Sequence, residues 1–210
     1  MKYKIIIFDL DGVLFDTIEI ARLQLSENYL GLTKEIQKEL LVGNFHEELK
    51  KFSLLKKEET EEAAAQRRLS YAKKKSLALM FPGAKELLQK LHSEGYILVL
   101  NTSAYDRNCS PLLERAGVTA LFDFLATAEI SKSKADKFRM IEEKYGVPSD
   151  ELLFVTDTLG DIREADLANV PTIAVTWGAH DRNYFAREKH ANLIGIVDSS
   201  DELEVFILKH

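Results

Sequence analysis

The chain has 210 residues, of which 46% are hydrophobic and 30% are charged, and its formal net charge is −6. This composition supports one sizeable buried core with an inserted segment, and it excludes a disordered chain and a disulfide-stabilised miniprotein. The single cysteine, Cys109, cannot form an internal disulfide, which agrees with a reducing compartment. The acidic net charge argues against a dedicated nucleic-acid-binding protein.

The N-terminal apolar run is short. Residues Ile5 to Phe8 are followed at once by Asp9 and Asp11, so the run ends before it reaches the length of a signal-peptide core. Every other apolar run also falls well below the roughly 18 residues that a membrane span requires. We therefore expect a cytoplasmic protein that does not bind a membrane.

Short apolar segments alternate with helical patterns along most of the chain. The apolar segments at 5–8, 97–100, 124–126, 152–155 and 172–175 have the length of buried strands. Helices are predicted from Pro82-Gly83 to Gly95, from Pro111 to near Gly117, and over the stripe of Phe138, Ile141 and Tyr145. The alternation predicts an α/β fold, a Rossmann-like three-layer α/β/α core with a parallel sheet.

The segment between the first two strands, residues 17–80, has a different pattern. It contains no proline, and Gly31 and Gly43 are its only strong helix breakers, so we expect two to four helices inserted into a core made of residues 1–16 and 81–210. Its basic residues are interpreted as solvated helix faces, with a positive rim for an anionic ligand as the alternative. They include Arg67, Arg68, Lys73, Lys74 and Lys75.

Acidic residues follow two of the predicted strands, at the sheet edge where ligands bind in such folds. Asp9 and Asp11 are two residues apart in extended chain and can point to the same side. Asp157 and Asp161 follow the strand at 152–155. Such a group of carboxylates suits a hard divalent cation, and an open octahedral site favours Mg²⁺, whereas zinc would require histidine or cysteine ligands.

Uncharged polar residues and lysines follow the other strands. Thr102 and Ser103, together with Asn101, can hydrogen-bond a phosphate oxygen or cap a turn. Lys132 and Lys134 precede the helix that carries Phe138, where a lysine can bind a phosphoryl group.

Taken in this order, these motifs resemble those of the haloacid dehalogenase-like hydrolase superfamily. The resemblance spans residues 4 to about 178 and rests on Asp9-Leu10-Asp11-Gly12-Val13, Leu100-Asn101-Thr102-Ser103, Lys134, and Asp157-Thr158-Leu159-Gly160-Asp161. Two departures are visible: Thr156 and Thr158 flank Asp157 where the family usually has glycine and serine, and Ala135 replaces the usual proline after the lysine. Lys132 therefore stays an alternative to Lys134 as the phosphate-binding lysine.

The resemblance implies a Mg²⁺-dependent phosphatase that hydrolyses a small phosphomonoester, in the manner of a phosphoglycolate phosphatase. Asp9 would be the nucleophile that forms an aspartyl phosphate, and Asp11, which the dehalogenases of the family lack, would be the general acid and base. Thr102, Ser103 and Lys134 would hold the phosphoryl oxygens. The metal ligands would be Asp9, Asp11, Asp157 and Asp161.

Two related functions remain open alternatives, namely a phosphomutase and a non-catalytic binding protein of the same fold. A receiver-like phosphorylation switch is disfavoured by the chain length and by the early position of the first acidic pair. The substrate and the choice between monomer and homodimer are not determined by the sequence.

The resemblance also implies that residues 17–80 form a helical cap that selects the leaving group. Within it, the segment Asn44-Phe45-His46 after Gly43 is the predicted specificity loop. Arg22, Lys50 and Lys51 are further candidates to face the site. Trp177-Gly178 is expected to flank the pocket or to anchor the core.

Overall fold

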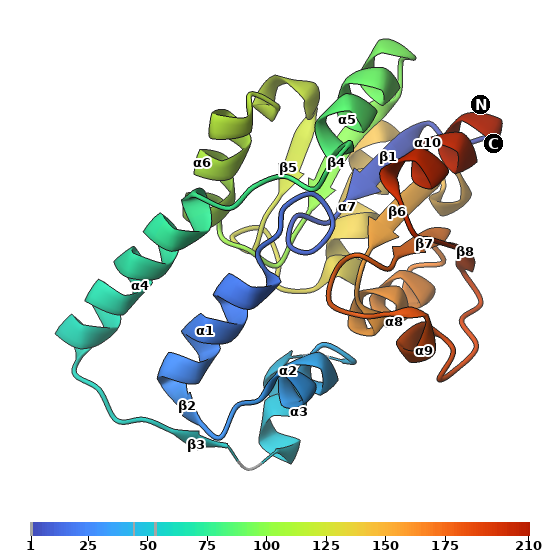
Figure 1. Cartoon of the computed structure of the whole chain (residues 1–210). Coiled ribbons are helices and arrows are strands. Elements are labelled where there is room, and N and C mark those ends of the chain that lie inside the picture. The colour runs from blue at the N-terminus through green and yellow to red at the C-terminus, as the bar shows by residue number, and fades with distance from the viewer. Residues whose placement is uncertain (1, 44, 53) are drawn as a thin grey trace.

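The computed structural model describes residues 2–43, 45–52 and 54–210. A six-stranded sheet forms its centre, with the strand order β5-β4-β1-β6-β7-β8 (Figure 1). All pairings in this sheet are parallel. The strands are β1 (Ile5–Phe8), β4 (Ile97–Asn101), β5 (Phe124–Ala126), β6 (Leu152–Thr156), β7 (Thr172–Val175) and β8 (Leu193–Val197). The predicted fold class is confirmed, and β8 is an additional edge strand that the sequence analysis missed.

Both faces of the sheet are buried, which explains why β1 reads as a continuous apolar run. Successive side chains of a strand point to opposite faces. Ile6 and Phe8 therefore pack into one hydrophobic cluster, and Ile5 and Ile7 pack into another on the opposite face.

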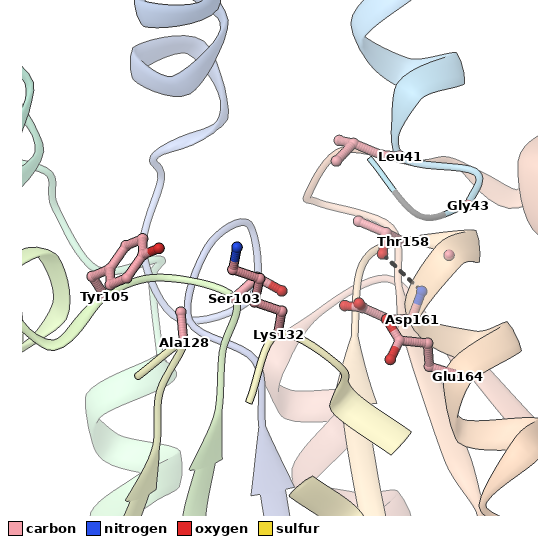
Figure 2. Close-up of a pocket in the computed structure, with 10 residues that line it drawn as sticks. Leu41, Gly43, Ser103, Tyr105, Ala128, Lys132, Thr158, Asp161 and Glu164 are labelled. Carbon is pink, nitrogen blue, oxygen red and sulfur yellow. Dashed lines mark hydrogen bonds between the residues drawn. The ribbon is translucent and has the colours of Figure 1, made fainter. Parts of the chain in front are cut away.

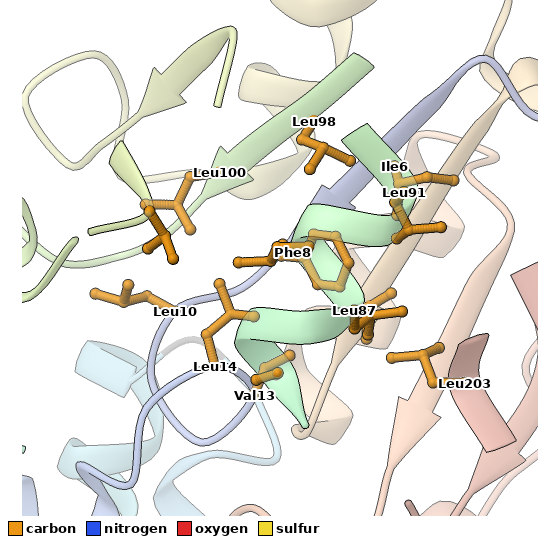
Figure 3. Close-up of a cluster of buried hydrophobic side chains, with 14 of the residues drawn as sticks. Ile6, Phe8, Leu10, Val13, Leu14, Leu87, Leu91, Leu98, Leu100 and Leu203 are labelled. Carbon is orange, nitrogen blue, oxygen red and sulfur yellow. The ribbon is translucent and has the colours of Figure 1, made fainter. Parts of the chain in front are cut away.

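Helices cover each face. The cluster around Ile6 and Phe8 is closed by α5 (Ala84–Ser93), α6 (Asp106–Ala116) and α10 (Ser200–Lys209), through residues such as Leu87, Leu91 and Leu203 (Figure 3). The opposite face is covered by α7 (Lys134–Tyr145) and α8 (Leu159–Leu167). A short helix, α9 (Arg182–Phe185), and two 3₁₀ turns at 119–121 and 149–151 complete this part of the chain.

One predicted helix boundary is wrong. The prediction placed Pro111 at the start of a helix, whereas α6 begins at Asp106 and contains Pro111. The Glu129 carboxylate accepts a hydrogen bond from the Asp106 N–H, with both of its oxygens at 3.0 Å, and so satisfies a backbone donor that the helix itself leaves free.

Residues 17–80, called the insertion from here on, leave the core after β1 and return before α5. The insertion contains α1 (Ile18–Asn28), β2 (Tyr29–Leu30), α2 (Lys34–Leu40), α3 (Phe45–Lys51), β3 (Leu55–Lys56) and α4 (Glu61–Ser76). Its four helices agree with the prediction, but the antiparallel pair of β2 and β3 was not foreseen. In Figure 1, α1 and α4 run beside each other away from the sheet, and β2 and β3 lie at the far end. Across the described residues, every helix is too short or too polar to span a bilayer.

Candidate active site

The first acidic pair lies directly beyond β1. Asp9 is 6% exposed, and its Oδ1 accepts a hydrogen bond from the Leu10 N–H at 2.8 Å. Asp11 lies in the following turn, where Thr17 Oγ1 donates to its Oδ1 at 2.5 Å. These hydrogen bonds hold the Asp9 carboxylate at the end of β1 and the Asp11 carboxylate in the turn that follows.

Lys134 connects the first acidic pair to the second. It is the first residue of α7, its side chain is buried, and its Nζ lies 2.9 Å from Asp9 Oδ2 and 2.6 Å from Asp161 Oδ2. Asp161 also accepts from Thr156 Oγ1 at 2.7 Å, and the Thr158 hydroxyl accepts from the Asp161 N–H as the N-cap of α8. The two threonines that depart from the family pattern therefore have defined structural roles.

Asp157 completes a cluster of three carboxylates. Asp9, Asp157 and Asp161 each offer an oxygen, and these oxygens lie within 4.8 Å of one another. Asp157 is fully buried; its Oδ2 accepts from the Ala179 N–H at 2.7 Å, while its Oδ1 has no hydrogen-bond partner among the described residues. A buried carboxylate that has an unpartnered oxygen and lies beside two further carboxylates fits a hard divalent cation such as Mg²⁺.

Two glycines make room for Asp157. A Cβ atom on Gly12 or on Gly178 would collide with the Asp157 carboxylate, and Gly12 has a positive φ of 77°. Glycine is therefore required at Gly12 both for the backbone conformation and for the close approach. The Gly in the Asp-x-Asp-Gly motif is explained by this contact between two strand ends.

The three carboxyl groups of the cluster differ in the direction of their pKa shifts. Burial raises the pKa of Asp9 to about 7, and the Asp161 and Asp11 carboxylates add to this effect, while Lys134 opposes it. Burial and the Asp9 carboxylate also raise the pKa of Asp157 well above its usual value. Burial acts in the same direction on Asp161, but the Lys134 ammonium outweighs it and lowers the pKa of Asp161. The cluster thus requires positive charge to stay fully ionised near neutral pH.

The polar residues after β4 have different environments. Thr102 is fully buried, its Oγ1 accepts from the Ala104 N–H at 3.0 Å, and among the described residues its hydroxyl hydrogen has no acceptor. Ser103 is exposed at the same edge. Asn101 is buried behind it, and its Nδ2 donates to the Lys134 carbonyl at 3.3 Å, so Asn101 supports α7.

Two connected cavities lie above the acidic cluster. The inner one, of about 190 Å³, has Asp9, Thr102 and Lys134 in its wall, and residues of α1 and α2 line it on the side of the insertion. The outer one, of about 470 Å³, shares Ser103, Thr158 and Asp161 with it and is also lined by Lys132 and Glu164 (Figure 2). Lys134 therefore lies at the acidic cluster, while Lys132 lines the outer cavity.

The insertion touches the core next to this site. The Gly160 N–H donates to the Leu41 carbonyl at 2.9 Å, and His180 Nε2 lies 2.8 Å from the Lys38 carbonyl. His180 Nδ1 accepts from the Leu159 N–H, so Nε2 carries the hydrogen that is donated to Lys38. Burial lowers the pKa of His180, which agrees with a neutral ring.

Two buried lysines near the site were missed by the sequence analysis. Lys75 in the last turn of α4 is 1% exposed, and its Nζ lies 2.6 Å from Asp11 Oδ1 and 2.7 Å from Oδ2. The interpretation of the whole basic cluster as a solvated face is therefore wrong for Lys75. Lys137, one turn after Lys134 in α7, is fully buried as well. Helical spacing to Lys134 is the one sequence signal that pointed to Lys137.

The other candidates of the sequence analysis lie elsewhere. Arg22 pairs with Glu19, and Lys51 pairs with Glu48 on an exposed face. Lys50 is exposed. Trp177 donates from Nε1 to the Val13 carbonyl at 3.1 Å and packs near Phe81, so it anchors the loop beyond β1. Asn44 and the side chain of His46 lie outside the described part of the chain.

Comparisons with known proteins agree with this geometry. A phosphoglycolate phosphatase of Pseudomonas syringae pv. tomato is 28% identical over 209 residues, which cover 91% of this chain and 76% of that protein. Among solved structures, a haloacid dehalogenase-like hydrolase from Streptococcus pneumoniae matches with a TM-score of 0.76 at 20% identity, covering 98% of this chain and 99% of the other. CbbY from Rhodobacter sphaeroides, solved in complex with phosphate, matches with a TM-score of 0.73 at 21% identity, covering 96% of each chain. The family model for haloacid dehalogenase-like hydrolases matches residues 6–175, and the chain belongs to this family.

Proposed function

We propose that the protein is a Mg²⁺-dependent phosphatase that hydrolyses a small phosphomonoester through an aspartyl phosphate on Asp9. The observation that carries this proposal is the contact of Lys134 with both Asp9 and Asp161 beside a third buried carboxylate, Asp157. The similarity to curated phosphoglycolate phosphatases supports the same reaction class. A small phosphorylated metabolite is the corresponding substrate class, residues 17–80 would be the cap over it, and a cytoplasmic location is part of the proposal.

Asp9, Asp157 and Asp161 would hold the metal together with the backbone carbonyl of Asp11. The bound cation would supply positive charge that lets an anionic nucleophile approach an anionic phosphoryl group. Its presence would also offset the raised pKa values of Asp9 and Asp157.

In the first step, an oxygen of the Asp9 carboxylate forms a bond to phosphorus as the bond from phosphorus to the ester oxygen breaks. The Asp11 carboxyl group gives its proton to the departing alkoxide, which leaves as an alcohol. Thr102 and Ser103 donate hydrogen bonds to the phosphoryl oxygens, and the Lys134 ammonium offsets their charge.

In the second step, water attacks the phosphorus of the aspartyl phosphate and the Asp11 carboxylate takes up the water proton. Inorganic phosphate leaves, and Asp9 is regenerated as a carboxylate. The contacts of Thr17 and Lys75 with the Asp11 carboxylate, at the wall of the inner cavity, support the assignment of both proton transfers to Asp11. Residues of α1 and α2 line the inner cavity, and this cover by the insertion would limit the entry of further water.

The test is phosphate release from a panel of phosphomonoesters that includes 2-phosphoglycolate and sugar phosphates, with Mg²⁺ and with EDTA. We expect metal-dependent release by the wild type and none by Asp9→Asn. Asp16→Asn is the matched control, because Asp16 is an exposed carboxylate a few residues away. Absence of release from every ester, or full activity in Asp9→Asn, refutes the proposal. Transfer of phosphate between positions of a sugar without its release would identify a phosphomutase.

A further inference from the structure

Lys137 is a buried charge that the proposed reaction does not use. Its side chain is fully buried in the first turns of α7, and its Nζ donates to the Thr102 carbonyl at 2.6 Å. Within the described residues, Lys137 has no carboxylate at ion-pair distance. A buried ammonium group without a counter-charge is costly, so its position calls for a compensating anion.

The charges around Lys137 also favour a bound anion. Burial lowers the pKa of Lys137 to about 8, and the nearby Lys134 ammonium adds to the effect. The carboxylates of Asp9, Asp161 and Glu164 act in the opposite direction. Both lysines also lie near the N-terminus of α7, where the helix dipole disfavours cations. An anion bound at this helix end would therefore be attracted by two ammonium groups and by the helix itself.

The hydrogen bond from Lys137 fixes the orientation of one peptide unit. Because a trans peptide is planar, the Thr102 carbonyl and the Ser103 N–H point in opposite directions. The carbonyl points toward Lys137, so the N–H points away from it. Within the described part of the chain, that N–H has no hydrogen-bond acceptor. Thr102 and Ser103 both line the inner cavity with Asp9 and Lys134.

We propose that Lys137 is a positioning residue of the phosphoryl site. Its ammonium group holds the Thr102 carbonyl so that the Ser103 N–H faces a phosphoryl oxygen, and its buried charge adds to that of Lys134. A carbonyl that is bonded to a cation also makes the N–H of the same peptide a stronger donor. This inference rests on the proposed phosphatase function, since it concerns the anion site of that reaction.

The test compares Lys137→Met with Arg139→Met in the full-length protein loaded with Mg²⁺. Methionine has nearly the length of lysine but neither charge nor donor. Arg139 lies on the exposed side of the same helix, where it pairs with Asp136. Four quantities are measured for each variant: the Kd for inorganic phosphate by titration calorimetry, the melting temperature, and kcat and KM for the preferred ester.

We expect Lys137→Met to raise the Kd for phosphate by about tenfold or more, in line with the loss of a charge-assisted hydrogen bond. Most of the kinetic loss should be in KM, because the phosphoryl group is bound in both the ground state and the transition state. The melting temperature should be unchanged or higher, since an uncompensated buried charge is removed. A merely structural lysine would give the opposite result, a lower melting temperature with an unchanged Kd.

A Kd for phosphate equal to that of Arg139→Met overturns the inference, as does a wild type that does not bind phosphate. If Lys137→Met does not fold, Lys137→Leu takes its place; it also lacks both the donor and the charge, so an unchanged Kd again overturns the inference. The calorimetric measurement does not depend on turnover. A wild type that binds phosphate but hydrolyses no ester therefore refutes the proposed function and still tests Lys137.

Discussion

Ionisation of Asp9 is expected to destabilise the metal-free protein as the pH rises. Burial, followed by the Asp161 and Asp11 carboxylates, raises the pKa of Asp9 from 3.8 to about 7 against the attraction of Lys134. A carboxyl group whose pKa is raised on folding stabilises the native state fully below its unfolded pKa. This contribution is lost as the pH rises through the folded pKa. The loss should therefore extend from near pH 3.8 to about pH 7.

The size of this destabilisation follows from the unfolded and folded pKa values of Asp9. The difference between 3.8 and about 7 corresponds to roughly 4 kcal/mol of unfolding free energy. Asp9 is 6% exposed, so solvent screens this cost little. Asp9→Asn has nearly the same shape but cannot ionise. Without metal, we expect it to melt roughly 10 °C above the wild type at about pH 8, and the difference should vanish at about pH 4.

Mg²⁺ should act on the same carboxylates. Because the metal supplies positive charge where Asp9 ionises, it should raise the melting temperature of the wild type more at about pH 8 than at about pH 5. The metal should raise the melting temperature of Asp9→Asn less than that of the wild type. Thermal unfolding followed by circular dichroism, with EDTA or with Mg²⁺, measures both effects. Asp16→Asn should behave as the wild type. If Asp9→Asn and the wild type melt at the same temperature at every pH without metal, the assigned electrostatics are wrong.

Three further substitutions test contacts around the site. Lys75→Met should lower kcat by about 10- to 100-fold, because Asp11 loses the charged group that orients it for proton transfer; steady-state kinetics at saturating substrate measures this. Gly178→Ala should weaken Mg²⁺ binding, measured by calorimetry, because its new Cβ displaces the Asp157 carboxylate. Glu39→Gln should raise KM by about two- to fivefold with little change in kcat, because the insertion loses a bidentate pair to the core that is worth at most about 1 kcal/mol.

Each of these substitutions has a matched control. Lys73→Met changes an exposed lysine of the same helix and should leave kcat unchanged, so equal losses in both lysine variants would contradict the role of Lys75. Gly95→Ala introduces backbone strain at a φ of 88° where no atom is near, and should cost stability without changing Mg²⁺ affinity. Glu58→Gln changes an exposed acid of the insertion, so a rise in KM there would argue for a general charge effect.

The sequence predicted the strand ends well because their signals are local. An apolar strand followed by Asp9, and another followed by Asp157, can be recognised from spacing, and the parallel sheet then brings them together. The edge strand β8 was missed because its side chains are mostly half-buried and Gly195 interrupts its pattern. Such a segment has neither the continuous apolar run of a buried strand nor a clean alternation.

The buried lysines show where local reasoning fails. Lys73, Lys74 and Lys75 are consecutive in the sequence, and only packing of α4 against the loop beyond β1 decides that Lys75 is the buried one. The same applies to Lys137, which a helical pattern places on the face of Lys134 but whose partner, the Thr102 carbonyl, comes from the loop that follows β4. A lysine in a sequence predicts solvent exposure by default, because burial of its charge requires a partner that the sequence does not reveal.

The contact of Lys75 with Asp11 links the two parts of the molecule chemically. Lys75 belongs to α4 of the insertion, whereas Asp11 belongs to the loop beyond β1. Any movement of α4 relative to that loop must therefore lengthen or break this ion pair and leave the Asp11 carboxylate to Thr17 and solvent. The insertion also contributes Leu41, whose carbonyl binds the first turn of α8 beside Asp161. In the proposed reaction, binding of a leaving group under the insertion and orientation of Asp11 would consequently be parts of one equilibrium. A substrate that fits the inner cavity would favour the arrangement that is ready for proton transfer.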